Sequence, residues 1–154
     1  MQLTQYTDYG LRTLIALGVA RPRMLTVGEI SGAYGISRNH LVKVVARLAE
    51  LGYVTTVRGK GGGMRLARDP ADIRVGMVVR QMEAELGVVE CLETGGGRCV
   101  IAPSCRLKSM LHAATQRFMD ELDAHSLADV LQQSAPLSRL LGIPVSVETD
   151  PAGA

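Results

Sequence analysis

The chain has 154 residues, of which 47% are hydrophobic and 21% charged, and its formal net charge is +2. This length and apolar content suit one compact domain with a real core, or a small domain with an appended helix. No apolar run approaches a membrane span and no basic, apolar leader begins the chain, so we expect a soluble, cytoplasmic protein. Three cysteines cannot all pair within one chain, which argues against a disulfide framework.

The net charge hides a division along the chain. Residues 1–80 carry twelve Lys and Arg against five Asp and Glu, a net of +7, whereas residues 81–154 carry five against ten, a net of −5. A basic first half indicates a polyanionic partner, although two ordinary solvated faces would give the same charges. Charge alone leaves these two interpretations even.

Apolar spacing and capping signals predict three helices in the first third of the chain. Apolar positions three or four apart indicate an amphipathic helix over 4–20. Thr26-Val-Gly-Glu29 has the form of a capping box and starts a short helix over 27–34. After a glycine turn, Ser37 is a good N-cap for a helix over 38–51. Two helices joined by so short a turn have the layout of a helix-turn-helix.

A β-hairpin is predicted directly after this helix pair. The β-branched run 53–58 and the short strand 64–68 flank Gly59-Lys-Gly-Gly-Gly63, a sequence suited to a hairpin tip. A nucleotide-binding loop is the weaker interpretation, because the lysine is followed by glycine and no helix opens after it. We therefore predict a mainly α fold with a small β-wing, in which residues 1–80 form a winged helix-turn-helix domain that binds DNA.

A recognition helix enters the major groove by its N-terminus, so its first turns should carry groups that reach phosphates and base edges. Arg38 can form two hydrogen bonds with guanine, and Asn39 can donate to bases or phosphates. A helical hairpin with a polar outer face would look similar, and the wing favours DNA. The predicted DNA-binding set is Thr26, Ser37, Arg38, Asn39, His40, Lys43, Arg58, Lys60, Gly61, Gly62 and Arg65.

The second half of the chain is predicted to hold two more substantial helices. One runs over 75–85 and is ended by Gly87, and the other is the longest in the chain, over 104–124. The apolar positions of the long helix step by four, three, four and four, which marks a single seam. These positions are Leu107, Leu111, Ala114, Phe118 and Leu122. A dimer reading a two-fold site favours packing of this seam against a partner helix, and core packing within one chain is the alternative.

The end of the chain carries weaker signals. Ser126-Leu-Ala-Asp129 is a second capping box and starts a short helix that runs to about 132. We assign 81–133 to a cysteine loop and a dimerisation helix. The proline-containing segment 134–154 is predicted to be a loosely ordered tail, whose Leu137, Leu140 and Leu141 dock on the body.

All three cysteines, Cys91, Cys99 and Cys105, lie within fifteen residues, in and beside a glycine-rich loop over 88–104. Such a group in a cytosolic chain indicates a metal or redox site. Its spacing matches neither a zinc ribbon nor a thioredoxin-like dithiol, and Gly95–Gly97 let the backbone turn sharply. Thiolate ligands suit zinc, cuprous copper or iron-sulfur clusters, with a fourth ligand from elsewhere. A thiol redox sensor remains the alternative.

Four segments, in order, resemble the NsrR family of bacterial nitric-oxide-sensing repressors, which is related to the iron-sulfur regulator IscR. They are MQLTQYTDYGL at 1–11, ISRNHLVK at 36–43, GYVTTVRGKGGG at 52–63 and PSCRLK at 103–108. The resemblance runs from Met1 to about Leu141. Two features depart from the pattern: the interval between Cys91 and Cys99 is longer than in enteric members, and position 108 is Lys where IscR-like members carry a histidine ligand.

The resemblance implies a homodimeric winged-helix repressor of nitrosative-stress genes. Its three cysteines would hold an iron-sulfur cluster, favoured as 4Fe-4S although 2Fe-2S fits the ligand count equally, and nitric oxide would attack the cluster and release DNA. Asp8 of the partner subunit is then a candidate fourth ligand, beside the simpler interpretation that this carboxylate suits its helix dipole. The alternative is a thiol-redox or iron-sulfur-status regulator of the IscR type. An enzyme is the least favoured class, because no histidine has a nucleophile at motif spacing.

Overall fold

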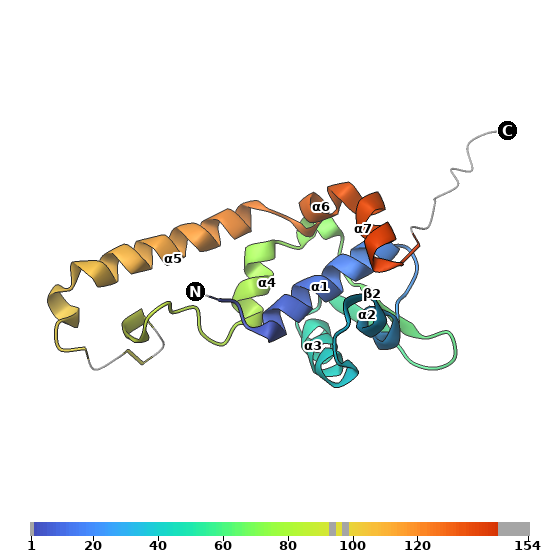
Figure 1. The fold of residues 1–154 in the computed structure, drawn as a ribbon, viewed down its shortest axis with the longest axis horizontal. Helices are drawn as coiled ribbons and strands as arrows, with labels where there is room; N and C mark the ends of the chain where they lie inside the picture. The colour runs from blue at the N-terminus through green and yellow to red at the C-terminus, as the bar shows by residue number, and fades with distance from the viewer. Residues whose placement is uncertain (1, 93–94, 97–98, 145–154) are drawn as a thin grey trace.

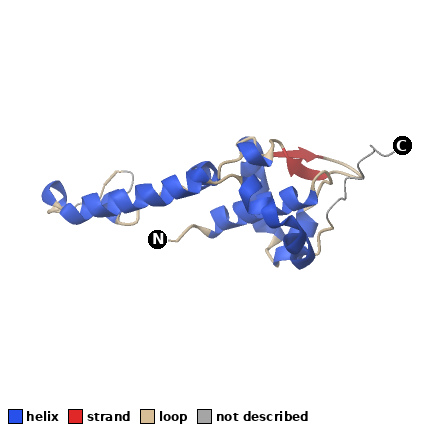
Figure 2. Ribbon diagram, turned by 90° about the horizontal axis from the view of Figure 1, so that it is seen from above, coloured by secondary structure: helices blue, strands red, loops and turns tan. Residues whose placement is uncertain are grey.

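The computed structural model describes residues 2–92, 95–96 and 99–144. It is mainly helical with a two-stranded antiparallel sheet, as predicted (Figures 1 and 2). In both views the long helix α5 (Arg106–Ala124) extends away from a globular head formed by the other α-helices and the hairpin. Part of the predicted cysteine loop (93–94 and 97–98) and the end of the predicted tail (145–154) lie outside the described residues.

The first three helices confirm the predictions and are α1 (Gln5–Ala20), α2 (Val27–Tyr34) and α3 (Arg38–Glu50). The Thr4 side chain caps α1 by accepting a hydrogen bond from the Thr7 amide. Thr26 caps α2 through the predicted capping box. Ser37 occupies the N-cap position of α3, but its side chain makes no capping hydrogen bond. The three helices therefore start where local signals place them.

The wing is a hairpin of β1 (Val54–Val57) and β2 (Gly63–Leu66), one or two residues shorter at each outer end than predicted. Val54 pairs with Leu66 and Val57 with Gly63. At the tip, Gly61 has a φ of 80°, and a Cβ on Gly62 would collide with the Val57 carbonyl oxygen. Only glycine satisfies both positions, so the tip sequence fixes the turn.

One hydrophobic core joins α1, α3, the hairpin and α4 (Val75–Met82) in the head. Its side chains are at most 1% exposed at many positions, and burying each such leucine contributes about 1.5 to 3 kcal/mol. The largest of them are Tyr53, Leu14, Leu17, Leu25, Ile30, Leu41, Leu48 and Ile73.

Helix α4 ends at Met82, three residues earlier than predicted, and Gly87 plays no part in its termination. Glu83 has an extended backbone, and its carboxylate accepts hydrogen bonds from the backbone amide and the hydroxyl of Thr4, at 2.7 and 3.0 Å. Glu83 therefore binds Thr4, the N-cap residue of α1, instead of extending α4. Within the described ranges, no helix combines the length and the apolar composition needed to cross a lipid bilayer.

The prediction of a loosely ordered tail from residue 134 is wrong for the described part. The second capping box is present and starts α6 (Leu127–Val130), a short 3-10 turn follows, and then comes a further helix, α7 (Ser134–Leu141). Pro136 suggested disorder, but it lies in the first turn of α7, where a helix can do without the missing amide hydrogen.

Helix α7 packs on the head through the side predicted to dock. Leu137 and Leu141 contact the core, and Ile143 just beyond the helix is 4% exposed. The prediction is wrong for Leu140, which is 83% exposed. One residue turns a helix by about 100°, so Leu140 lies to one side of the contact that Leu141 makes with the core. After α5, which extends away from the head, the chain therefore packs against α1 again through α7.

Candidate nucleic-acid interface and cysteine site

Helix α3 is fixed in rotation by the apolar stripe that its sequence predicts. The buried residues are Leu41, Val44, Val45 and Leu48. Because these side chains lie in the core, the remaining positions of the helix must face away from it. The predicted DNA-binding residues of this helix are all exposed: Ser37, Arg38, Asn39, His40 and Lys43.

Two tyrosines of α1 hold the first turns of α3, and sequence reasoning missed both. The Tyr6 hydroxyl donates a hydrogen bond of 3.2 Å to the Lys43 carbonyl. The ring of Tyr9 stacks against His40, with centroids 6.3 Å apart. These contacts join residues more than thirty positions apart, so no local pattern reports them. They fix the helix whose exposed face is the candidate interface.

Arg38 lies across the start of α2. A Cβ built on Gly28 would stand 3.8 Å from the guanidinium carbon of Arg38, which is ordinary contact distance. The guanidinium therefore lies near Gly28 while the side chain remains exposed. This placement keeps the guanidinium close to the helix-turn-helix surface.

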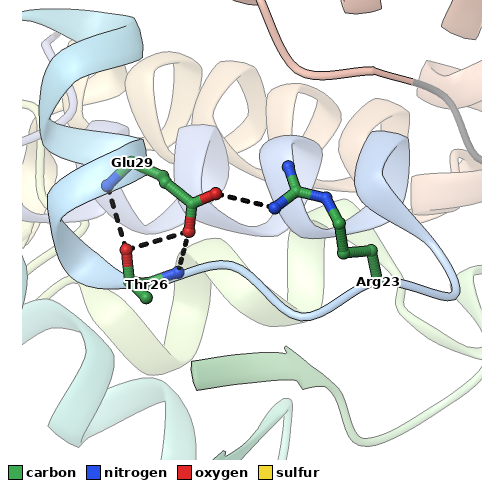
Figure 3. A network of polar contacts seen from close by, with 3 residues as sticks. All are labelled: Arg23, Thr26 and Glu29. Carbon is green, nitrogen blue, oxygen red and sulfur yellow. Dashed lines mark hydrogen bonds and ion pairs between the residues drawn. The ribbon is translucent and has the colours of Figure 1, made fainter. Parts of the chain in front are cut away.

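Thr26 belongs to a polar network at the start of α2 (Figure 3). Its hydroxyl accepts a hydrogen bond from the Glu29 amide at 3.2 Å and donates one of 2.9 Å to the Glu29 carboxylate. Arg23 pairs with the same carboxylate at 2.6 Å. The Arg23 hydrogen bond, followed by those from Thr26, lowers the pKa of Glu29. The direct role of Thr26 is thus a cap, and its contact with DNA stays a prediction.

The wing presents the predicted cations to solvent. Arg58 and Lys60 lie at and beyond the end of β1, Arg65 lies on β2 opposite Thr55, and all three cations are exposed. Gly61 and Gly62 form the tip between them, as described above. Their contacts with phosphate or the minor groove stay predictions.

The three cysteines are free thiols in different settings. Cys91 lies in a 3-10 turn (Glu90–Leu92) and is half-buried, Cys99 is exposed, and Cys105 is the N-cap of α5. Within residues 2–92, 95–96 and 99–144, no three Cys, His, Asp or Glu side chains are placed to hold a metal ion. The structure therefore does not gather the predicted ligands.

The chemistry of the donor groups nevertheless suits a thiophilic metal. The sulfur of Cys105 accepts a hydrogen bond of 3.4 Å from the Lys108 amide at the start of α5, where a negative charge is stabilised. Gly95 and Gly96 have φ angles of 98° and 62°, so the loop turns as predicted; Gly97 lies outside the described residues. Soft cysteine sulfurs outside any disulfide, on such a loop, fit zinc or iron-sulfur ligation.

Asp8 is engaged within its own chain. Its Oδ1 accepts a hydrogen bond of 3.0 Å from the Nε of Arg12, and its Oδ2 forms an ion pair of 2.9 Å with the Nη2; both side chains are more than 40% exposed. The guanidinium of Arg12 also lies 5.8 Å from the ring centre of Tyr34. Asp8 occupies the first turn of α1, as its helix-dipole role requires. Its role as a ligand stays a prediction.

Helix α5 is covered by the head only near its C-terminal end. Arg80 of α4 pairs with Asp123 at 2.6 Å, and Met119, which the predicted seam did not include, is the one buried residue of α5. At the other end of the helix, the seam residue Leu107 is 60% exposed, and Met110, which lies beside the seam, is 67% exposed. The seam therefore does not serve the core of a single chain at its distal end, and the dimer stays a prediction.

Comparison with known proteins decides the family. Residues 3–133 match the family model described as "Rrf2: Iron-dependent Transcriptional regulator". The chain belongs to the Rrf2 family. It is 47% identical over 142 residues to the HTH-type transcriptional regulator NsrR of Geobacillus kaustophilus, covering 92% of this chain and 97% of the relative. The NsrR of Bacillus subtilis is 46% identical over the same share of each chain.

Solved structures agree with this Rrf2 assignment. T. potens IscR matches with a TM-score of 0.68 and 26% identity, covering 87% of this chain and 88% of the other. Oxidised Staphylococcus aureus CymR matches with a TM-score of 0.71 over 86% and 97% of the two chains; at 21% identity this likeness shows the fold alone. The resemblance to NsrR and the winged-helix fold predicted from the sequence are confirmed. This Rrf2 protein is a transcriptional regulator, a role that requires no catalytic group.

Proposed function

We propose that this Rrf2 regulator is a nitric-oxide-sensitive repressor of nitrosative-stress genes that binds operator DNA through α3 and the wing. The observation that carries the proposal is the set of three free thiols confined to the segment that joins α4 to the start of α5. Two further findings support it. The matching family is described as an iron-dependent transcriptional regulator, and two relatives that span almost the whole chain are named NsrR.

In this proposal Cys91, Cys99 and Cys105 hold an iron-sulfur cluster, and Asp8 of the partner subunit completes the ligand set. Either a 4Fe-4S cluster, which we favour, or a 2Fe-2S cluster takes four ligands. When bound, the cluster supplies iron that reacts with nitric oxide. Cys105 caps α5, so the loop is anchored at its C-terminal end to the helix proposed to form the dimer. Loss of the cluster would free Cys91 and Cys99 and would leave the loop held only by this cap.

On the DNA side, the predicted DNA-binding residues of α3 divide into two roles. Arg38 and Asn39 are suited to pair with guanine and adenine edges in the major groove. Ser37, His40 and Lys43 reach phosphates. In a homodimer joined along α5, two such helices would read the two halves of a palindromic site.

The wing would extend the same contact. Arg58, Lys60 and Arg65 meet phosphates or the minor groove, and the glycines at 61 and 62 let the backbone approach the DNA closely. The wing groups are cations at exposed strand and tip positions. Added salt should therefore weaken their contribution to affinity by the same factor for every DNA sequence.

The test uses protein purified without oxygen and a duplex that it selects from random DNA. Wild type should be brown, contain iron and sulfide, and lose affinity for the duplex on exposure to nitric oxide at one fixed salt concentration. Cys99→Ala should lack the chromophore and the tight, specific binding. Val100→Ala, next to it and 94% exposed, should retain both. A full chromophore in Cys99→Ala, or equal affinity with and without the cluster, contradicts the proposal.

A second candidate is a thiol-redox or iron-sulfur-status regulator of the IscR type. The scattered placement of the three free thiols favours the thiol form of this alternative. It predicts colourless protein with three titratable thiols and DNA binding that responds to oxidants. Zinc-loaded protein would also be colourless, and metal analysis separates the two.

A further inference from the structure

The polar face of the recognition helix α3 carries one large apolar side chain. Val42 is 55% exposed, whereas the other valines of α3, Val44 and Val45, are 0% and 6% exposed. Single exposed valines are common on soluble proteins, so exposure alone assigns no role. The position of Val42 among the proposed DNA-reading residues is what distinguishes it.

Val42 lies three positions after Asn39 and four after Arg38, so the three side chains share one face of α3. Neither Val42 nor the helix can turn inward, because Leu41 and Leu48 are fully buried and the Tyr6 hydroxyl holds the Lys43 carbonyl. A valine has no hydrogen-bonding group in its side chain. In a major groove it can recognise only the apolar feature of the base edges, which is the 5-methyl group of thymine.

We propose that Val42 is a specificity-determining residue that contacts a thymine methyl group beside the bases read by Arg38 and Asn39. This inference rests on the proposed DNA binding by α3 and adds to it the identity of one base. The contact is worth roughly the burial of one methyl group, which corresponds to about a fourfold change in affinity.

Replacing thymine with deoxyuridine removes the methyl group and leaves base pairing intact. Each thymine of the selected duplex is replaced in turn, and the dissociation constants are measured with oxygen-free wild-type protein. We expect one position per half-site at which the replacement weakens binding about fourfold. In Val42→Ala the same replacement should have no effect, because the methyl group has lost its contact.

The matched control is Val57→Ala, which removes the same atoms from a valine that is 45% exposed at the end of β1. This variant should keep the deoxyuridine effect in full. If no thymine replacement matters, or if Val42→Ala retains the fourfold penalty, the assignment of Val42 is overturned while DNA binding stands. If the protein selects no duplex at all, the proposed function fails together with the inference.

Discussion

The head and the distal end of α5 differ in how much of their apolar surface the chain itself covers. In the head, Leu41 and Leu48 are 0% exposed, and α1 and α2 begin at residues whose side chains cap them. At the far end, Val100 is 94% and Met110 is 67% exposed beside the free thiols. The head is therefore a complete fold in one chain, whereas the cysteine end exposes the kind of surface that partners or ligands cover.

This contrast separates the exposed face of α3, whose geometry the chain itself fixes, from the cysteine end. The exposed face of α3 is fixed by buried side chains and by Tyr6 and Tyr9, so it exists before DNA arrives. Cys91 lies in a 3-10 turn, and Cys105 is the N-cap of α5. Cys99 is exposed and lies in no helix or strand. In the proposed function, loss of the cluster would act first on the cysteine end and would reach α3 and the wing through the helices that join them.

The largest expected effect tests how much the buried side chains of the head contribute to the free energy of unfolding. Leu48→Ala removes a fully buried side chain and should lower the free energy of unfolding by about 2 to 5 kcal/mol. Leu140→Ala, at a position 83% exposed on α7, should change it by less than about 0.5 kcal/mol. Denaturant titration followed by circular dichroism measures both. Equal losses would mean that burial in the head does not dominate its stability.

The second prediction concerns self-association through the exposed distal end of α5. Met110→Asp places a charge on the exposed apolar end of α5 and should weaken self-association at least tenfold, since burying one such side chain contributes about 1.5 to 3 kcal/mol. Sedimentation velocity over a range of protein concentrations measures the change. Leu140→Asp is the matched control and should leave association unchanged. Unaltered association of Met110→Asp would remove α5 from the proposed interface.

The same contrast explains what the sequence could predict. Helix α2 begins and ends as expected because both signals are local: the Thr26 and Glu29 capping box at one end and Gly35, with a φ of 66°, at the other. Helix α7 was missed because it is held by Leu137 and Leu141 packing on the core, which is long-range information.

For the site, the exposed residues of α3 follow from its 3.6-residue apolar period, and the wing follows from its glycines. The support from Tyr6 and Tyr9 does not, because it depends on how α1 crosses α3. The arrangement of the cysteines around a bound metal group, as proposed, would depend on that group, and no local pattern in the sequence reports it. Residue types and spacing can indicate such a site, but they do not place its atoms.

A smaller effect compares two N-cap serines, Ser126 of α6 and Ser37 of α3. The Ser126 hydroxyl accepts from the Asp129 amide at 3.3 Å and donates to its carboxylate at 2.7 Å, whereas Ser37 makes no capping hydrogen bond. Ser126→Ala should therefore lower the free energy of unfolding by about 0.5 to 2 kcal/mol. Ser37→Ala should lower it by no more than a few tenths. A stable Ser37→Ala variant also lets any loss of DNA affinity be read as a lost contact.

The smallest effect concerns the polar network at the start of α2. The hydrogen bond from Arg23, with those from Thr26, lowers the pKa of Glu29 below its ordinary value of 4.5. A carboxyl group whose pKa is lower in the folded protein than in the unfolded chain stabilises the fold above the unfolded value, and this contribution is lost as the pH falls through the folded value. Because the Glu29 side chain is 40% exposed, solvent screening limits the contribution to at most about 1 kcal/mol.

Glu29→Gln should remove this pH dependence while keeping a neutral capping group. Relative to wild type, the variant should be less stable near pH 7, and the difference should shrink as the pH falls below 4.5. Urea titrations at a series of pH values measure it. Glu50→Gln, in the longer 3.3 Å pair with Arg47 on the surface of α3, serves as the control and should keep the acid-dependent loss of wild type. If Glu29→Gln tracks wild type at every pH, the network is not a stabilising part of the head, and the capping of α2 must rest on the Thr26 hydroxyl alone.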